Sequence, residues 1–174
     1  MTTLEIRRAT QHDVPAVAGI LEDAIAWAAE AGFDSWDPGS FDDPHGWGRQ
    51  RLFEALEANA LYLIWLDDET VGTFSILPVD PLFWPDAPDD ALYLHRFAVR
   101  DAHRGAGIGA AALDWIADEA RRTGRRYIRL DCLEANPGIR AYYERAGFDY
   151  RGDITVNGLR FSLYELDLSG PQPA

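Results

Sequence analysis

The sequence predicts an α/β protein built on a mixed β-sheet with helices on both faces. Three observations predict this class. Apolar residues recur at helical spacing in some stretches and form strand-like runs in the segments between them. Two pairs of strand-like segments are each joined by a short turn, which predicts hairpins. One buried strand passes through a glycine-rich loop into a long helix and then another strand, which predicts a parallel pair with a right-handed crossover.

The chain starts with a predicted strand and a predicted helix. Leu4–Arg8 alternates apolar and polar residues, as a half-buried strand does. Thr10–Asp13 is a helix-start signal, and Pro15 suits the first turn. Apolar residues at helical spacing continue to about Glu30, and Gly32 is the predicted end.

The next segment, residues 33–48, mixes aromatic, acidic, proline and glycine residues without a sustained period. It is predicted to be a loop or a broken helix. Trp36 and Trp47 lie in it and have two interpretations. They clamp the loop onto the core, or they form an aromatic, acidic wall for an amine substrate through cation–π contact or charge.

A short helix and a hairpin are predicted before the middle of the chain, at Arg49–Ala58, Ala60–Leu66 and Thr70–Leu77. The segment Pro78–Asp90 is proline-rich and cannot form a central strand. Its Phe83 and Trp84 either overhang an active site or staple the loop down.

The second half of the chain is predicted to hold four strands and two helices. The long helix has its apolar face at Leu113, Ile116, Ala117 and Ala120 and ends at Thr123-Gly124. The other elements are strands at Leu92–Val99, Tyr127–Leu133, Tyr150–Val156 and Leu159–Leu168, and a helix from Pro137 to about Arg145. Asn157-Gly158 is the predicted hairpin turn. Residues 1–169 are predicted to form one domain, and 170–174 a frayed tail.

The glycine-rich loop predicts anion binding. Gly105, Gly107 and Gly109 alternate just before the predicted helix, so the backbone can approach a ligand closely. A helix start presents unpaired N–H groups and the positive end of its dipole, which suit a phosphate. Arg104 adds a full positive charge. The alternative is that the glycines only make a close turn.

A dinucleotide site is one interpretation of this loop. Gly105–Ala110 satisfies G-x-G-x-x-G/A, and Asp131 follows at about the distance at which that fingerprint has its acidic residue. However, Arg100–Arg104 separates the strand from the glycines, and the chain after Asp131 is too short for further βαβ units. A P-loop is excluded because no Gly-Lys-Ser/Thr follows.

Two motifs carry a family resemblance. Arg104–Gly109 resembles the R/Q-x-x-G-x-G/A motif of the GCN5-related N-acetyltransferases (GNAT), which holds the pyrophosphate of acetyl-CoA. Asn136–Phe148 resembles the family's N-x-x-A-x-x-x-Y-E-x-x-G-F block. The resemblance extends from about residue 60 onward. It implies the acyl-CoA N-acyltransferase fold, with a mostly antiparallel mixed sheet, and direct transfer of acetyl from acetyl-CoA to a primary amine.

The resemblance also implies roles for individual residues. Tyr143 occupies the position of the general acid. A coenzyme-binding set comprises Phe97, Ala98, Val99, Arg104, Gly105, Ala106, Gly107, Ile108, Gly109, Ala110 and Asn136, and the aromatic residues Trp36 and Trp84 are expected to contact the acceptor.

His95 is a candidate base. Leu94–Val99 resembles the strand of arylalkylamine N-acetyltransferases in which histidines help to deprotonate the amine, and a histidine titrates near neutrality. A hydrogen-bonded core histidine is the alternative role for His95. Glu134, Asp131 or ordered water are alternative bases.

Composition narrows the function further. The formal net charge is −13, which argues against nucleic acid as a partner. An acidic surface attracts cationic amines, or it only keeps the protein in solution. The acidic loops slightly favour a small cationic amine over a protein tail as the acceptor. Cys132 is the one cysteine, so no intrachain disulfide forms, and it is expected to be a small buried residue rather than a nucleophile. No metal is expected. No apolar signal core or membrane-length run is present, so a cytoplasmic location is expected.

Two further functions stay open beside the N-acetyltransferase. One is a non-catalytic acyl-CoA sensor or interaction domain on the same fold, and the other is the disfavoured nicotinamide oxidoreductase. The acceptor amine and the choice between acetyl-CoA and a longer acyl-CoA stay open. So does the oligomeric state, although dimers are common in the family.

Overall fold

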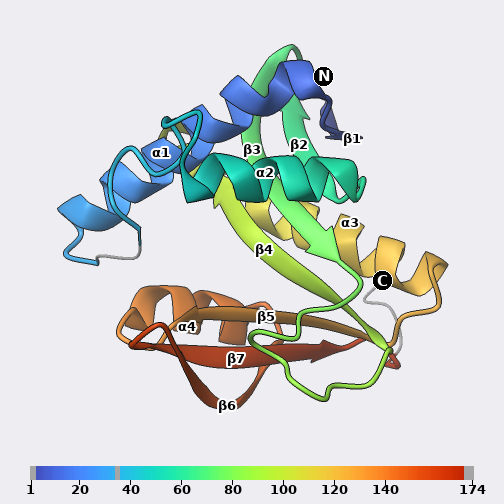
Figure 1. Ribbon diagram of the computed structural model, residues 1–174. Helices are drawn as coiled ribbons and strands as arrows, with labels where there is room; N and C mark the ends of the chain where they lie inside the picture. The colour runs from blue at the N-terminus through green and yellow to red at the C-terminus, as the bar shows by residue number, and fades with distance from the viewer. Residues whose placement is uncertain (1–2, 34–35, 171–174) are drawn as a thin grey trace. The chain divides into compact units, whose positions relative to one another are not determined.

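The computed structural model describes residues 3–33 and 36–170 and has the mixed α/β architecture that the sequence predicts (Figure 1). The strand order in its seven-stranded sheet is β1-β2-β3-β4-β5-β7-β6. Strands β4 and β5 are parallel, whereas the pairs β1–β2, β2–β3, β5–β7 and β6–β7 are antiparallel. The strands are β1 Leu4–Arg8, β2 Leu61–Leu66, β3 Glu69–Leu77, β4 Ala91–Val99, β5 Tyr127–Leu133, β6 Asp149–Val156 and β7 Leu159–Asp167.

Within residues 3–33 and 36–170, four α-helices and two short 3-10 turns connect these strands. The helices are α1 Val14–Glu30, α2 Trp47–Glu57, α3 Ile108–Arg122 and α4 Pro137–Arg145, and the turns are η1 Gln11–Asp13 and η2 Asp101–His103. In the part of the chain that the structure describes, no helix is both long and apolar enough to cross a membrane.

The chain divides into two compact units, Met1–Ile76 with Arg96–Ala112, and Leu77–His95 with Leu113–Ala174. The division falls inside β4 and inside α3, so each of these elements contributes residues to both units. The prediction of one domain over residues 1–169 stays a prediction.

The first unit has its core between α1, α2 and β2. The helices turn their apolar faces to the strand, where Leu61 and Leu63 are fully buried. Val17, Ile20 and Leu52 contribute from the helices, and none has measurable exposed surface. The apolar residues that recur every 3.6 positions in the sequence of α1 therefore form this buried face.

The second unit is a sheet of β5, β7, β6 and the first half of β4, with α4 packed against it. The register pairs Ala91–Leu94 with Tyr127–Leu130, which is the predicted parallel neighbour. Asn157 and Gly158 have φ values of 50° and 79°, as the hairpin turn between β6 and β7 requires.

Two predicted helix boundaries differ from the structure. α2 starts at Trp47, two residues earlier than predicted, because Gly46 in extended conformation takes the N-cap position. α3 starts at Ile108, so Gly109 lies inside its first turn and not in the loop before it. The sequence pattern missed this because glycine is a poor helix former in a helix interior.

Candidate functional site

The glycine-rich loop has the geometry of an anion-binding helix start. Gly105 and Gly107 have φ values of 76° and 79°, which favour glycine. The carbonyl of Gly107 accepts a hydrogen bond from the N–H of Ala111 at 3.0 Å, so Gly107 is the N-cap of α3. The N–H groups of residues 108–110 therefore point out of the helix start, at the positive end of its dipole.

Arg104 is held beside this loop by α1. Its Cζ atom lies 3.8 Å from the ring centroid of Trp27, and its Nε atom lies 3.2 Å from Oδ1 of Asp101. Burial lowers the pKa of the Arg104 guanidinium and the charge of Asp101 opposes that effect, so the group keeps its charge at neutral pH. The arrangement preserves a cation within reach of an anion on the loop.

β4 has an irregular backbone in its second half. Arg96 has a φ of 50°, which is uncommon for a residue other than glycine and interrupts the regular strand just before Phe97 and Ala98. A Cβ atom on Gly72 of β3 would lie 2.9 Å from the carbonyl oxygen of Ala98, so the backbones approach closely there. The N–H of Arg100 then donates to the carbonyl of Val71 at 2.8 Å.

His95 lies between two carboxylates in the second unit. Its Nε2 atom is 3.3 Å from Oδ2 of Asp80, and its Nδ1 atom is 3.9 Å from Oδ1 of Asp131. The three side chains are between 8% and 15% exposed. The imidazole thus has one carboxylate at each ring nitrogen, in largely desolvated surroundings where such contacts are stronger than in water.

These three residues also have ligand types that bind metal ions. One atom of each lies within 4.8 Å of the others. The carboxylates, however, approach different ring nitrogens, and a histidine ligand gives only one nitrogen to an ion. The arrangement therefore fits a hydrogen-bonded imidazole better, and the expected absence of a metal stays a prediction.

Tyr143 is buried on the inner face of α4, with 5% of its surface exposed. Its ring contacts those of Phe148 and Tyr164, with centroids 5.5 Å and 6.4 Å apart. Burial, reinforced by the nearby Cys132 thiol, Tyr142 and Asp131, raises the pKa of the Tyr143 phenol above its ordinary value. The phenol therefore stays protonated at neutral pH.

The end of α4 explains the second sequence motif. Gly147 has a φ of 92° and ends the helix, which lets the N–H of Phe148 donate to the carbonyl of Tyr143 at 3.0 Å. Asn136 caps the other end, where its Oδ1 atom accepts from the N–H of Ile139 at 3.1 Å. The motif thus specifies a short helix that presents Tyr143 in one orientation.

The tryptophans suggested for the acceptor lie in different surroundings. Trp36 packs against the core of the first unit and makes edge contacts with Phe41 and Trp47, at centroid distances of 5.2 Å and 6.2 Å. Glu22 of α1 fixes this loop by accepting from the N–H groups of Gly39 and Phe41. Trp36 is therefore packed against the core, while Trp47 is 50% exposed, and the contact with the acceptor that was expected of Trp36 stays a prediction.

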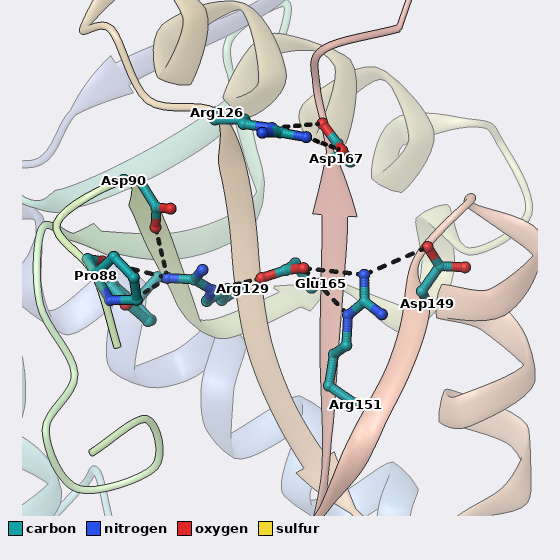
Figure 2. Close-up of polar contacts among 9 residues, drawn as sticks. Pro88, Asp90, Arg126, Arg129, Asp149, Arg151, Glu165 and Asp167 are labelled. Carbon is teal, nitrogen blue, oxygen red and sulfur yellow. Dashed lines mark hydrogen bonds and ion pairs between the residues drawn. The ribbon is translucent and has the colours of Figure 1, made fainter. Parts of the chain in front are cut away.

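Trp84 belongs to a polar cluster in the second unit that Figure 2 shows in part. The Cζ atom of Arg129 lies 5.3 Å from the Trp84 ring centroid. The Arg129 side chain is 6% exposed and lies 2.7 Å from Glu165 and 2.9 Å from Asp90 (Figure 2). Tyr93 completes the surroundings, 3.0 Å from Nη1 of Arg129. Trp84 thus contacts Arg129 of β5 from the proline-rich loop, and its expected contact with the acceptor stays a prediction.

Asp80 was not among the residues that the sequence identified. It follows Pro78-Val79 in a loop without a motif, and only the fold brings it to His95 of β4. An aspartate at the start of a proline-rich turn is a weak signal, because aspartates are common in turns. Cys132, by contrast, is buried as expected, and burial raises the pKa of its thiol to about 12.

Comparison with known proteins places these features in a family. Residues 21–148 match the model of the Acetyltransferase (GNAT) family. The chain is 26% identical over 166 residues to the uncharacterized N-acetyltransferase YesJ of Bacillus subtilis, covering 92% of this chain and 88% of that one. It is also similar to a GNAT-family acetyltransferase of Listeria monocytogenes, at 26% identity and a TM-score of 0.75 over 94% of both chains.

A second similar structure is a putative acetyltransferase of Salmonella typhimurium, solved with its cofactor acetyl-CoA. It has a TM-score of 0.66 and 20% identity, covering 98% of this chain and 96% of that one, which shows a shared fold. The family model spans both the glycine-rich loop and the Tyr143 helix, the two segments that carry the family's motifs in this sequence. The chain therefore belongs to the GNAT family of acetyltransferases and is an enzyme of the N-acetyltransferase class.

Proposed function

We propose that this enzyme transfers an acetyl group directly from acetyl-CoA to the primary amine of a small, positively charged acceptor. The observation that carries the proposal is the loop Arg104–Ala110, in which left-handed Gly105 and Gly107 lead into the start of α3. The solved Salmonella typhimurium relative, which shares the fold, holds acetyl-CoA. A pyrophosphate group is the part of that cofactor that suits such a helix start.

The loop and β4 bind the coenzyme in this proposal. The N–H groups of Ile108, Gly109 and Ala110 donate to the pyrophosphate oxygens, and Arg104 supplies the positive charge. The backbone of Phe97–Val99 binds the pantetheine arm, and one of its N–H groups stabilises the oxyanion that forms from the thioester. Asn136 contacts the coenzyme through its side-chain amide.

The chemistry requires a base for the acceptor ammonium and an acid for the departing thiolate. His95 takes a proton from the ammonium group of the acceptor, and the neutral amine attacks the thioester carbon. The tetrahedral intermediate then collapses, the C–S bond breaks, and Tyr143 gives its proton to the departing thiolate. The nitrogen of the new amide loses its second proton, which restores the phenol, and the proton on His95 returns to solvent.

The acceptor class follows from charge and aromatic residues. The chain carries 29 acidic against 16 basic residues, which favours a cationic ligand over an acidic one. Trp47, which is 50% exposed, supplies an aromatic face that attracts cations. An arylalkylamine, a polyamine, an amino acid or an aminoglycoside all carry the amine that this chemistry needs.

Release of free CoA thiol, measured with a panel of these amines, tests the proposal. We expect release that requires both acetyl-CoA and one class of amine, with the acetylated amine seen by mass spectrometry. Replacing Tyr143 by Phe is expected to lower kcat by roughly 10²- to 10⁴-fold with little change in acetyl-CoA binding, because only the proton donor is lost.

The neighbouring tyrosine is the matched control. Tyr142 lies on the same helix, with its ring 5.3 Å from that of Tyr143. Tyr142→Phe is expected to keep nearly full activity. Binding of acetyl-CoA without thiol release for any amine class would favour an acyl-CoA sensor, and an unchanged rate in Tyr143→Phe would remove the general acid.

A further inference from the structure

We propose that Asp80 is a positioning residue that fixes the proton of neutral His95 on Nε2 and so makes Nδ1 its basic nitrogen. The inference rests on the proposed role of His95 as the base. The observation behind it is the Asp80–His95–Asp131 arrangement, in which Oδ2 of Asp80 lies 3.3 Å from Nε2 of His95. With Nε2 protonated, this contact becomes a hydrogen bond from the ring to the carboxylate.

The Asp80 carboxylate is itself fixed in place. Its Oδ1 atom accepts from the N–H of Phe83 at 3.3 Å, and its backbone carbonyl accepts from the N–H of Trp84 at 2.8 Å. These bonds form a turn in which one carboxylate oxygen is used by the loop and the other faces His95. The side chain is 8% exposed, so water competes little for it.

The two aromatic residues after Asp80 attach this turn to the sheet. The Phe83 ring meets Phe161 of β7 edge-on at 5.0 Å, and the Trp84 ring lies 6.4 Å from that of Tyr93 on β4. Such contacts hold a loop in one conformation. The proline-rich loop thus presents one carboxylate at a constant place beside His95.

The tautomer decides which nitrogen can act as base. A neutral imidazole has one N–H and one lone pair, and a hydrogen bond to a carboxylate selects the nitrogen that keeps the proton. With Nε2–H facing Asp80, the lone pair is on Nδ1. That nitrogen accepts the proton from the acceptor ammonium, and Asp131, 3.9 Å away, stabilises the imidazolium that forms.

Nitrogen-15 NMR of the whole protein tests the tautomer without any activity measurement. The chain has four histidines, so the His95 signals can be assigned by comparison with His95→Gln. At a pH where the ring is neutral, we expect a protonated Nε2 with a slowly exchanging N–H proton. Asp80→Ala is expected to abolish that slow exchange. A proton on Nδ1, or slow exchange that survives in Asp80→Ala, would overturn the proposal.

Kinetics test the consequence for catalysis. Asp80→Asn is expected to lower kcat roughly 10- to 100-fold while the KM for acetyl-CoA stays the same, since an orienting group is lost and the base remains. Asp80→Glu keeps a carboxylate and is expected to recover part of the rate. Asp89→Asn, on the same loop with a 76% exposed carboxylate, is the matched control and is expected to match the unsubstituted enzyme.

The outcomes separate this inference from the proposed function. Full activity in Asp80→Asn, with its fold intact by circular dichroism, would overturn the positioning role. Full activity in His95→Gln would instead remove His95 as the base, while the NMR result would still decide whether Asp80 fixes its tautomer.

Discussion

Residue by residue, burial determines the chemistry of the groups around Tyr143. Cys132 illustrates this, because its thiol is a nucleophile in principle but is only 9% exposed. Burial first, and then the charge of the adjacent Asp131, raise its pKa to about 12. The same desolvation raises the pKa of the Tyr143 phenol. The same buried environment thus keeps both the Cys132 thiol and the Tyr143 phenol protonated, and it makes the thiol a poor nucleophile.

The first prediction concerns Cys132 alone. With a pKa of about 12, roughly one thiol in ten thousand is ionised at pH 8. We expect a disulfide reagent to label the native protein far more slowly than an exposed thiol, and to label one thiol per chain after unfolding in guanidinium. Fast labelling of the native protein at pH 8 would contradict the burial.

This property also makes the thiol-release assay clean. Because the chain has one cysteine and that cysteine is buried, thiol that appears on mixing comes from CoA. Enzyme without acetyl-CoA gives the corresponding blank.

Among the elements, α3 offers a matched pair of glycines. Gly107 and Gly124 flank the helix with φ values of 79° and 74°, and a Cβ atom on either would have open space within 4 Å. Valine at either position therefore imposes a similar backbone strain, of about 1–3 kcal/mol. Only Gly107 belongs to the loop proposed to bind pyrophosphate.

Gly107→Val is accordingly expected to weaken acetyl-CoA binding by about tenfold or more, because the strained loop would shift its N–H groups away from the pyrophosphate, and each charge-assisted hydrogen bond lost costs about 1.5–3 kcal/mol. Gly124→Val is expected to bind normally while losing comparable stability. Calorimetric titration measures both affinities. Equal affinity in the two variants would count against the loop.

Two ion pairs of different exposure connect β7 with β5 and with the residue that precedes β5 (Figure 2). Burial alone would lower the pKa of Arg129, but its hydrogen bonds to Glu165 and Tyr93 and the charge of Asp90 raise it overall. Glu165 also binds Arg151, 3.1 Å away. By contrast, Arg126 and Asp167 form a pair whose side chains are 56% and 37% exposed.

Glu165→Gln is therefore expected to lower the free energy of unfolding by about 3–5 kcal/mol, because it leaves buried Arg129 incompletely paired. Asp167→Asn is expected to cost about 1 kcal/mol or less. Urea unfolding followed by circular dichroism measures both. Similar losses in the two variants would mean that burial does not separate these pairs.

How far the sequence predicts these features depends on how local they are. Local chemistry marks the turns and helix ends at Thr10, Gly32, Asn136 and Asn157-Gly158. The predicted order of strands and helices is confirmed. Gly109 is the exception, because the low helix propensity of glycine predicts a loop position, whereas Gly109 lies in the first turn of α3. The burial of Cys132 followed from the absence of a basic partner.

Contacts between segments that are distant in the chain could not be predicted from the sequence. Asp80 reaches His95 only through the fold of a loop that has no motif. Trp84, in the same loop, packs on Arg129 of β5, which comes 45 positions later in the chain. Neither pairing leaves a periodic or spaced pattern. The coenzyme and acceptor roles proposed for the site likewise come from resemblance to the family's motifs.

For the molecule as a whole, binding of the coenzyme is expected to raise the free energy of unfolding and the melting temperature. A ligand that binds only the native state adds about 2.7 kcal/mol at 100 times its dissociation constant. For a chain of this size each kcal/mol raises the melting temperature by about 2–4 °C, so saturating acetyl-CoA is expected to raise it by roughly 5–10 °C. NADH and ATP at equal concentration are the controls, and a smaller or no shift is expected for both.

The Gly107→Val variant makes this measurement specific to the loop, because its shift with acetyl-CoA should shrink even though its own melting temperature starts lower. A shift with NADH alone would mean that Gly105–Ala110 is a dinucleotide loop, and the roles of Tyr143 and His95 would then lose their basis. If Gly107→Val shows the same shift with acetyl-CoA as the unsubstituted enzyme, acetyl-CoA is still the coenzyme, but its pyrophosphate does not bind at the start of α3.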